Sequence, residues 1–196
     1  MASRPAPSTK RTSAAVPAEL FTRPPCKIHP SAVVSEKAQI TGTHTVELCE
    51  DSVLHPHSKI KAERGIVYIG KRTIICGATT VGVLEGEGNV IVGDEVTIEA
   101  GAVVEAKSVG DGTVIEAKAK IGRGAVIGKH CKITPLSEIS ADEQLPDYTI
   151  VYGDNQRRHD HTMADNAEVR DAQRKGQVLH IETLQKLIPN ASRKWT

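Results

Sequence analysis

Large aliphatic residues recur at every sixth position through the middle of the chain. They are Ile28, Val34, Ile40, Leu48, Leu54, Ile60, Ile69, Ile75, Val92, Ile98, Val104, Val109, Ile115, Ile121, Ile127, Ile133 and Ile139. Four residues after each of the first sixteen, from Ile28 to Ile133, stands a small residue, with His44 and Arg64 as exceptions. The residue directly after the aliphatic is often Gly, as in Gly70 and Gly93. Such a period predicts a protein built from structural repeats.

An offset of four has the parity of a β-strand, so the large and the small residue of a repeat point to the same side. An amphipathic helix would need offsets of three, four and seven, which these segments lack. Each repeat is therefore a short strand and a tight corner, where we expect the small residue to fit and Gly to ease the turn. The sequence predicts an all-β solenoid, a parallel β-helix of about six triangular coils over 26–153.

The interruptions of the repeat all fall between coils. They occur at 46–47, at 66–68, at 82–91 and as a one-residue deletion after Ser108. All insertions therefore leave the prism along one edge. The longest insertion carries Val83 and Leu84, which are candidate residues for binding a partner protein.

The C-terminal part departs from the repeat. Residues 145–153 predict a last strand, and the polar stretch 154–176 predicts a linker in which 164–175 could form a loose helix. A C-terminal amphipathic helix is predicted over 177–190 from apolar residues at helical spacing, namely Val178, Ile181, Leu184, Leu187 and Ile188. A short helix is not stable alone, so we expect these residues to dock it on the β-helix. Docking on a partner protein is the alternative.

Composition narrows the possible environments of the protein. Aromatic residues make up 3% of the chain, which suits a narrow aliphatic interior. The net charge of +1 gives no attraction to nucleic acid or to an anionic membrane. The four cysteines form no CxxC pair, which argues against a disulfide framework and fits a reducing compartment. No apolar run reaches the ~20 residues that span a bilayer, so we expect a soluble intracellular protein without membrane insertion.

The first 25 residues are rich in Ser, Thr, Ala and Pro, with several basic residues and Glu19 as the single acid. This composition is typical of a disordered tail or of a mitochondrial transit peptide. The prolines oppose the amphipathic helix that a transit peptide needs. A disordered tail over 1–25 is the preferred interpretation.

Two classes of enzyme are built on six-residue repeats of this kind, and the sequence lacks what each needs. Acyltransferases use a His general base near a protruding loop, but the insertion 82–91 contains no His and carries Glu85 and Glu87. Gamma-class carbonic anhydrases bind zinc through histidines five residues apart, and no two histidines here have that spacing. We therefore predict no catalytic, cofactor-binding or metal-binding residue.

His55 and His57 are the strongest remaining candidates for chemistry. At i and i+2 on a strand, both imidazoles would face outward and could hold a transition metal weakly. Surface histidines beside Pro56 are more often ordinary polar residues, and His159 and His161 in the polar linker are weaker candidates still. Stoichiometric zinc in protein purified without a His tag would contradict this interpretation.

Several runs of the sequence resemble the dynactin subunit 6 family. They are 27–34 (KIHPSAVV), 52–60 (SVLHPHSKI), 109–119 (VGDGTVIEAKA), 149–153 (TIVYG) followed by Arg157 and Arg158, and 184–190 (LQKLIPN). The resemblance spans about residues 27–190. The last two runs distinguish this family from other β-helical proteins, because the six-residue repeats themselves occur in many β-helices.

The resemblance implies a left-handed β-helix that acts as a non-catalytic scaffold subunit of the dynactin pointed-end complex. It implies a place in the cytoplasm and cytoskeleton, in dynein-dependent microtubule transport and in cargo or adaptor binding. The implied partners are dynactin subunit 5, which is the sister β-helical subunit, a pointed-end actin-related protein and a zinc-bearing subunit. Arg157 and Arg158 join Val83 and Leu84 as candidate partner contacts. The alternative is a homotrimeric hexapeptide enzyme, an acyltransferase or a relative of the gamma-class carbonic anhydrases.

Overall fold

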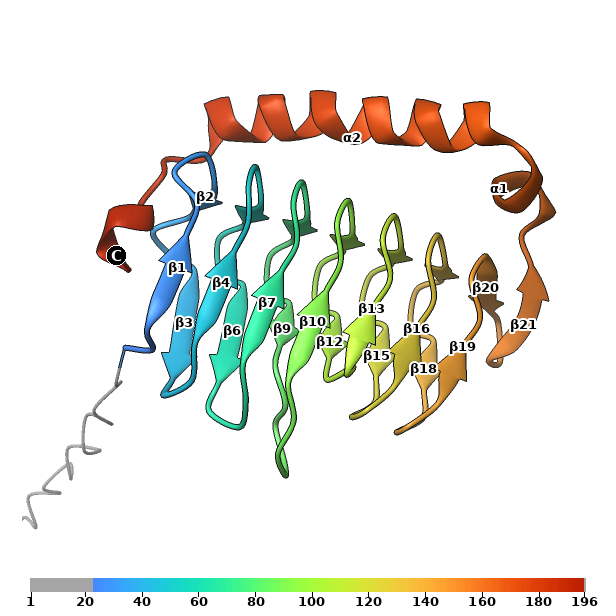
Figure 1. Ribbon diagram of the computed structural model, residues 1–196, viewed down its shortest axis with the longest axis horizontal. Helices are drawn as coiled ribbons and strands as arrows, with labels where there is room; N and C mark the ends of the chain where they lie inside the picture. The colour runs from blue at the N-terminus through green and yellow to red at the C-terminus, as the bar shows by residue number, and fades with distance from the viewer. Residues whose placement is uncertain (1–22, 196) are drawn as a thin grey trace, which may run out of the picture.

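Short parallel strands stack in three columns along a prism in the computed structural model, which describes residues 23–195 (Figure 1). The seven-stranded sheet contains β1 (Cys26–Ile28), β4 (Val46–Leu48), β7 (Val67–Ile69), β10 (Val90–Val92), β13 (Ser108–Val109), β16 (Val126–Ile127) and β19 (Gln144–Leu145). The eight-stranded sheet contains β2 (Val33–Val34), β5 (Val53–Leu54), β8 (Ile74–Ile75), β11 (Thr97–Ile98), β14 (Val114–Ile115), β17 (Lys132–Ile133), β20 (Thr149–Tyr152) and β21 (Gln156–His159). The six-stranded sheet contains β3 (Gln39–Gly42), β6 (Lys59–Ala62), β9 (Thr80–Val81), β12 (Val103–Val104), β15 (Lys120–Ile121) and β18 (Glu138–Ile139).

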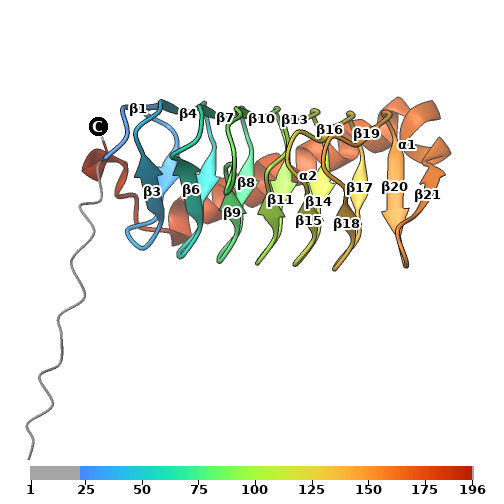
Figure 2. The same cartoon turned by 90° about the horizontal axis from the view of Figure 1, so that it is seen from below.

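Each strand pairs with the strand that follows it by one coil, as the six-residue period requires. Ile98 in β11, for example, is in register with Ile75 before it and Ile115 after it. Seen from below, the coils follow one another at even spacing along the prism (Figure 2). The predicted parallel β-solenoid of about six coils with a C-terminal helix is confirmed.

The repeated aliphatic residues form one continuous core, and Ile98 and Ile115 are completely buried. The small residues complete it, and six of the buried ones are polar, namely Ser52, Ser58, Thr73, Thr79, Thr113 and Ser137. Thr113 shows a reason for this that the repeat does not reveal. The Thr113 hydroxyl donates to the Gly128 carbonyl at 2.8 Å and accepts from the Cys131 amide at 3.1 Å. It thereby satisfies two backbone groups of the next coil at a buried corner, where an unpaired group would be costly.

The expected role of glycine was wrong. A Cβ added at Gly70 would lie 2.4 Å from the Gly93 carbonyl oxygen and 2.5 Å from Asp94 Oδ1. Gly70 is therefore required by the close approach of the next coil, and its φ is not in the left-handed region. The tight corners are made two residues later, by residues with positive φ, some of which are glycine, such as Gly112 (66°), and others not, such as Arg72 (51°) and Tyr148 (58°).

The C-terminal part is more ordered than the sequence suggests. β20 turns back into the antiparallel strand β21, which is followed by α1 (His161–Asp165), α2 (Ala167–Leu187) and the short 3-10 helix Ser192–Lys194. The stretch expected as a polar linker thus contains β21, α1 and the first half of α2. The Asn166 side chain caps α2 by accepting from the amides of Glu168 and Val169. No residue of α2 before Ile181 is fully buried, so apolar periodicity could not reveal its first half.

α2 runs the length of the prism, from α1 beside β20 to the corner above β2 (Figure 1). No helix among residues 23–195 is both long and apolar enough to cross a bilayer. The predicted disordered tail lies outside the described residues, apart from Arg23, Pro24 and Pro25.

Candidate binding surfaces

The C-terminal half of α2 packs on an apolar stripe of the eight-stranded sheet. Outward-facing residues of the first three coils, Val33, Val53 and Ile74, are buried there. Ile181 and Leu184 cover them and are 3% and 8% exposed. A separation of three residues along a helix is a rise of about 4.5 Å, close to the distance of about 4.8 Å between neighbouring strands. One helical residue therefore meets each coil in turn.

The other apolar residues expected to dock the helix have three different environments. Ile188 is partly buried against the same stripe, because it lies seven residues, or two turns, after Ile181. Val178 is half-buried at the side of the helix. Leu187 is 71% exposed, so its predicted docking role was wrong. Six residues after Ile181, it points about 120° away from the contact at 3.6 residues per turn.

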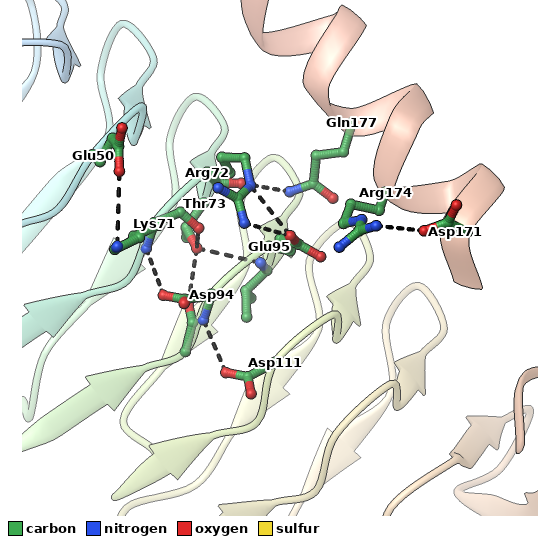
Figure 3. Close-up of polar contacts among 12 residues, drawn as sticks. Glu50, Lys71, Arg72, Thr73, Asp94, Glu95, Asp111, Asp171, Arg174 and Gln177 are labelled. Atoms are coloured by element: carbon green, nitrogen blue, oxygen red, sulfur yellow. Dashed lines mark hydrogen bonds and ion pairs between the residues drawn. The ribbon is translucent and has the colours of Figure 1, made fainter. Parts of the chain in front are cut away.

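An open groove of about 670 Å³ follows α2 along the neighbouring corner of the prism and is lined by Asp51, Arg72, Arg174, Lys175, Val178 and Leu179. Figure 3 shows partners for Arg72 and Arg174, two of the charged residues that line it. Arg72 forms an ion pair with Glu95 at 2.6 Å, and Gln177 donates to the Arg72 carbonyl at 2.7 Å. Arg174 forms an ion pair with Asp171 at 2.5 Å. The groove therefore offers no concentrated charge of one sign to a small ligand.

The coils beneath this groove are linked by a series of side-chain hydrogen bonds (Figure 3). The Lys71 amide donates to Asp94 Oδ1 at 2.7 Å, and the Asp94 amide donates to Asp111 Oδ1 at 3.0 Å. The pKa of Asp111 is lowered because, although burial opposes the shift, Lys129 pairs with its carboxylate and the Asp94 amide donates to it. These carboxylates hold successive coils together and are not free to bind a ligand.

His55 and His57 do not share the face of a strand, contrary to the prediction. β5 ends at Leu54, and the histidines lie at the following corner, where His57 has a φ of 64°. His55 Nε2 is buried and has no hydrogen-bond partner among the described residues. Burial, and then the proximity of His180 on α2, lower the pKa of His55. No group of three potential metal ligands exists within residues 23–195.

His130, Tyr148 and Arg170 form a second contact with α2 that the sequence did not reveal. The His130 and Tyr148 rings stack at 5.6 Å, and the Arg170 guanidinium lies 5.9 Å from the centre of the Tyr148 ring. Burial and Arg170 lower the pKa of His130, against the weaker opposite effect of the carboxylates Asp111, Glu95 and Asp147. Residues 130 and 170 are brought together only by the long return of the chain, so no local signal could have found this contact.

Acidification is expected to lower the free energy of unfolding through His55 and His130. Both have a pKa below the usual histidine value in the folded state, so the unfolded chain binds protons more readily. Their contribution is complete above about pH 6.5, the unfolded value, and is lost as the pH falls through the folded pKa. Urea unfolding at several pH values measures the effect. The variant His55→Gln/His130→Gln should lose less stability on acidification than the wild type, and an equal loss in both would contradict this prediction.

Val83 and Leu84, the candidate contacts in the insertion 82–91, differ in exposure. Val83 is 3% exposed and belongs to the core, so it is not available to a partner. Leu84 is 38% exposed, and its amide donates to Glu105 Oε2 at 2.8 Å. Arg123 steadies the loop by donating to the Glu85 carbonyl at 3.1 Å. Of the predicted pair, only Leu84 remains a candidate contact.

The two arginines after the last coil also differ. Arg157 forms an ion pair with Glu143 and donates to the Asn155 carbonyl at 2.6 Å, so it holds the β20–β21 hairpin to the prism. The Arg158 side chain is exposed on β21 and forms no hydrogen bond or ion pair with any residue of 23–195, although its backbone pairs with Ile150. Arg158 is therefore the better placed of the two to meet a partner.

His29 and Ser31 form the contact most like a catalytic pair, beside a groove of about 440 Å³ that His29 lines. His29 Nδ1 lies 2.9 Å from Ser31 Oγ. The Ser31 amide also approaches His29 Nδ1, at 3.3 Å, and Ser31 Oγ accepts from the Asp51 amide at 2.9 Å. These bonds are those of a structured turn. Within residues 23–195, no third group orients the imidazole as a catalytic base would require.

Comparison with known proteins agrees with this architecture. No protein-family model matches the chain. A solved Bacillus cereus structure named as an acetyltransferase covers 84% of the chain and 95% of its own length, with a TM-score of 0.53 and 18% identity. A hexapeptide transferase family protein from Anaplasma phagocytophilum covers 85% and 97%, with a TM-score of 0.50 and 15% identity. At these identities the likeness establishes the fold alone: the chain is a hexapeptide-repeat, left-handed β-helix protein.

Comparison with curated proteins points to a particular protein rather than to a fold alone. Dynactin subunit 6 of Nematostella vectensis is 29% identical, with 84% of this chain and 89% of the relative covered. Dynactin subunit 6 of Xenopus tropicalis is 28% identical (84% and 81% covered), and that of Danio rerio is 29% identical (84% of each). These relatives support the identification of the chain with the dynactin subunit 6 family.

Proposed function

We propose that this protein is a non-catalytic scaffold subunit of the dynactin pointed-end complex. In that role it would support dynein-dependent transport along microtubules, in the cytoplasm and on the cytoskeleton, and the binding of cargo or adaptors. The observation that carries the proposal is the similarity to dynactin subunit 6 over 84% of the chain. A rigid prism whose polar groups are already paired is suited to docking on other proteins, because little conformational entropy is lost on binding.

The proposed direct partner is dynactin subunit 5, with the pointed-end actin-related protein and the zinc-bearing subunit as further members of the assembly. Leu84 and Arg158 are the exposed candidate contacts, one on the insertion edge and one on β21. Neither nucleic acid nor a membrane is a proposed ligand.

Co-elution tests the proposal directly. Purified chain mixed with dynactin subunit 5 at micromolar concentration should elute as one complex in size-exclusion chromatography, because interfaces of standard size give affinities in this range or tighter. Leu84→Asp and Arg158→Glu, tested separately, should weaken the complex if these residues lie in the contact. Leu187→Asp is a matched control on the far side of α2. Separate elution of the two wild-type proteins would count decisively against the proposed function.

A homotrimeric acyltransferase is the second candidate, favoured by the names of the structural neighbours. Light scattering would report three chains per particle, and incubation with acetyl-coenzyme A and an amine acceptor would release thiol. His29→Ala should abolish thiol release if His29 is the base. The absence of both a trimer and thiol release would eliminate this candidate.

A further inference from the structure

The end of the prism at the first coil is covered by the end of the chain. In β2, the amides of Val33 and Ser35 donate to the next coil, to the carbonyls of Ser52 and Leu54 at 2.9 and 3.0 Å. Backbone groups alternate along a strand, so those of Val34 point away from the prism. Such a strand edge is a ready template for pairing with another chain.

Residues 190–195 satisfy this edge of β2 completely. Asn190 Oδ1 accepts from the Val34 amide at 3.2 Å, and Asn190 Nδ2 donates to the Ala32 carbonyl at 3.0 Å. The Ala191 amide donates to the Val34 carbonyl at 2.8 Å. The side-chain amide of Asn190 thus takes the place of a peptide group in a neighbouring strand. We call residues 190–195 the C-terminal cap.

The other two edges of the first coil are less protected. No described residue forms a hydrogen bond to the outward-facing backbone of Ile28 in β1 or of Ile40 in β3. Trp195 packs on the end of the core and lines a small pocket with Ile40. The cap therefore closes one sheet by hydrogen bonds and covers the core with a single aromatic ring.

The opposite end of the prism is closed by the chain itself. β21 pairs along the whole of β20, and Asn155 Oδ1 accepts from the Glu138 amide of β18 at 3.0 Å. Head-to-tail stacking of two copies would have to open this hairpin. Head-to-head contact of two first coils would need, of the residues that the structure describes, only the cap to move.

We propose that the C-terminal cap guards a self-association surface, and that a second copy of this chain docks on the first coil when the cap is displaced. The three strand edges form the sides of a triangle, and another first coil presents the same three edges at the same spacing. Two-fold symmetry about such a contact is self-complementary and closes the assembly at a dimer. The proposal is independent of any role in dynactin.

Light scattering of full-length variants tests this proposal. The double variant Asn190→Ala/Trp195→Ala should dimerise at least tenfold more tightly than the wild type, which should be monomeric at micromolar concentration. Asn190→Ala alone removes three side-chain hydrogen bonds and no apolar packing, so this single variant is the one to test if the double variant does not fold. Leu187→Ala, on the exposed face of α2, is the matched control. A synthetic peptide of residues 188–196 should return the variant to the monomer.

Hydrogen exchange locates the contact. On dimerisation, the amides of Ile28, Val34 and Ile40 should become protected, while those of the buried Ile98 remain protected throughout. A folded variant that stays monomeric overturns the proposal. So does a wild type that already dimerises through this end, or an equal gain of dimer in Leu187→Ala.

Discussion

Replacing Leu184 by Ala is expected to release the C-terminal half of α2 from the prism. Leu184 is 8% exposed and, with Ile181, supplies the only fully buried helix contact on Val33, Val53 and Ile74 among the described residues. Truncating a buried Leu costs about 2–4 kcal/mol, since apolar contacts are lost and a cavity remains. Hydrogen exchange of the α2 amides and urea unfolding should both report this loss.

The same helix provides the control. Leu187 lies three residues later but is 71% exposed, so Leu187→Ala should change the free energy of unfolding by less than about 0.5 kcal/mol. Equal effects of the two substitutions would show that α2 does not lie on the sheet in solution as described.

Gly70→Val should destabilise the third coil by about 3 kcal/mol, at the upper end of the usual cost of overpacking. The new Cβ would meet the Gly93 carbonyl oxygen at 2.4 Å and Asp94 Oδ1 at 2.5 Å. Because one of these atoms belongs to the backbone of the next coil, relief requires the two coils to separate locally. Thermal and urea unfolding measure the loss.

Gly176→Ala should have the opposite effect on the free energy of unfolding. Gly176 lies inside α2 with nothing within 4 Å of an added Cβ. Alanine there should stabilise the helix by about 0.5–1 kcal/mol, because glycine loses more backbone entropy on folding. A neutral Gly70→Val, or a destabilising Gly176→Ala, would contradict the close approach of coils at Gly70 and the open surroundings of Gly176.

The β-helix could be predicted because its strands and corners are determined by residues that lie close together in the sequence. Once the repeats are grouped in threes between the interruptions, Ile75, Ile98 and Ile115 are the second aliphatic residues of successive coils, and the register of β8, β11 and β14 follows from that grouping. The sign of φ could not be predicted in the same way. Arg72 and Tyr148 adopt positive φ although their side chains do not favour it, because the stacked coils impose the corner on them.

The surfaces were harder to predict because their contacts join distant parts of the chain. Asn190 meets Ala32 across 158 residues, and nothing near Asn190 signals that its side chain completes a sheet. Val83 looks exposed in an insertion, but the loop folds it back into the core. Leu187 fits a helical pattern, yet the buried face is narrow and passes through Leu184 and Ile188 instead.

The course of α2 alters how this solenoid should unfold. In a simple stack, each coil touches only its neighbours, so the ends fray first and the middle persists. Here the chain leaves the partial seventh coil formed by β19 and β20, travels back along the prism as α2, and its residue Asn190 contacts the first coil beside β2 (Figure 1). Neither end can fray without disturbing a helix that also contacts the other end. The helix therefore ties the ends of a linear array together, and we expect the coils to melt in one cooperative transition.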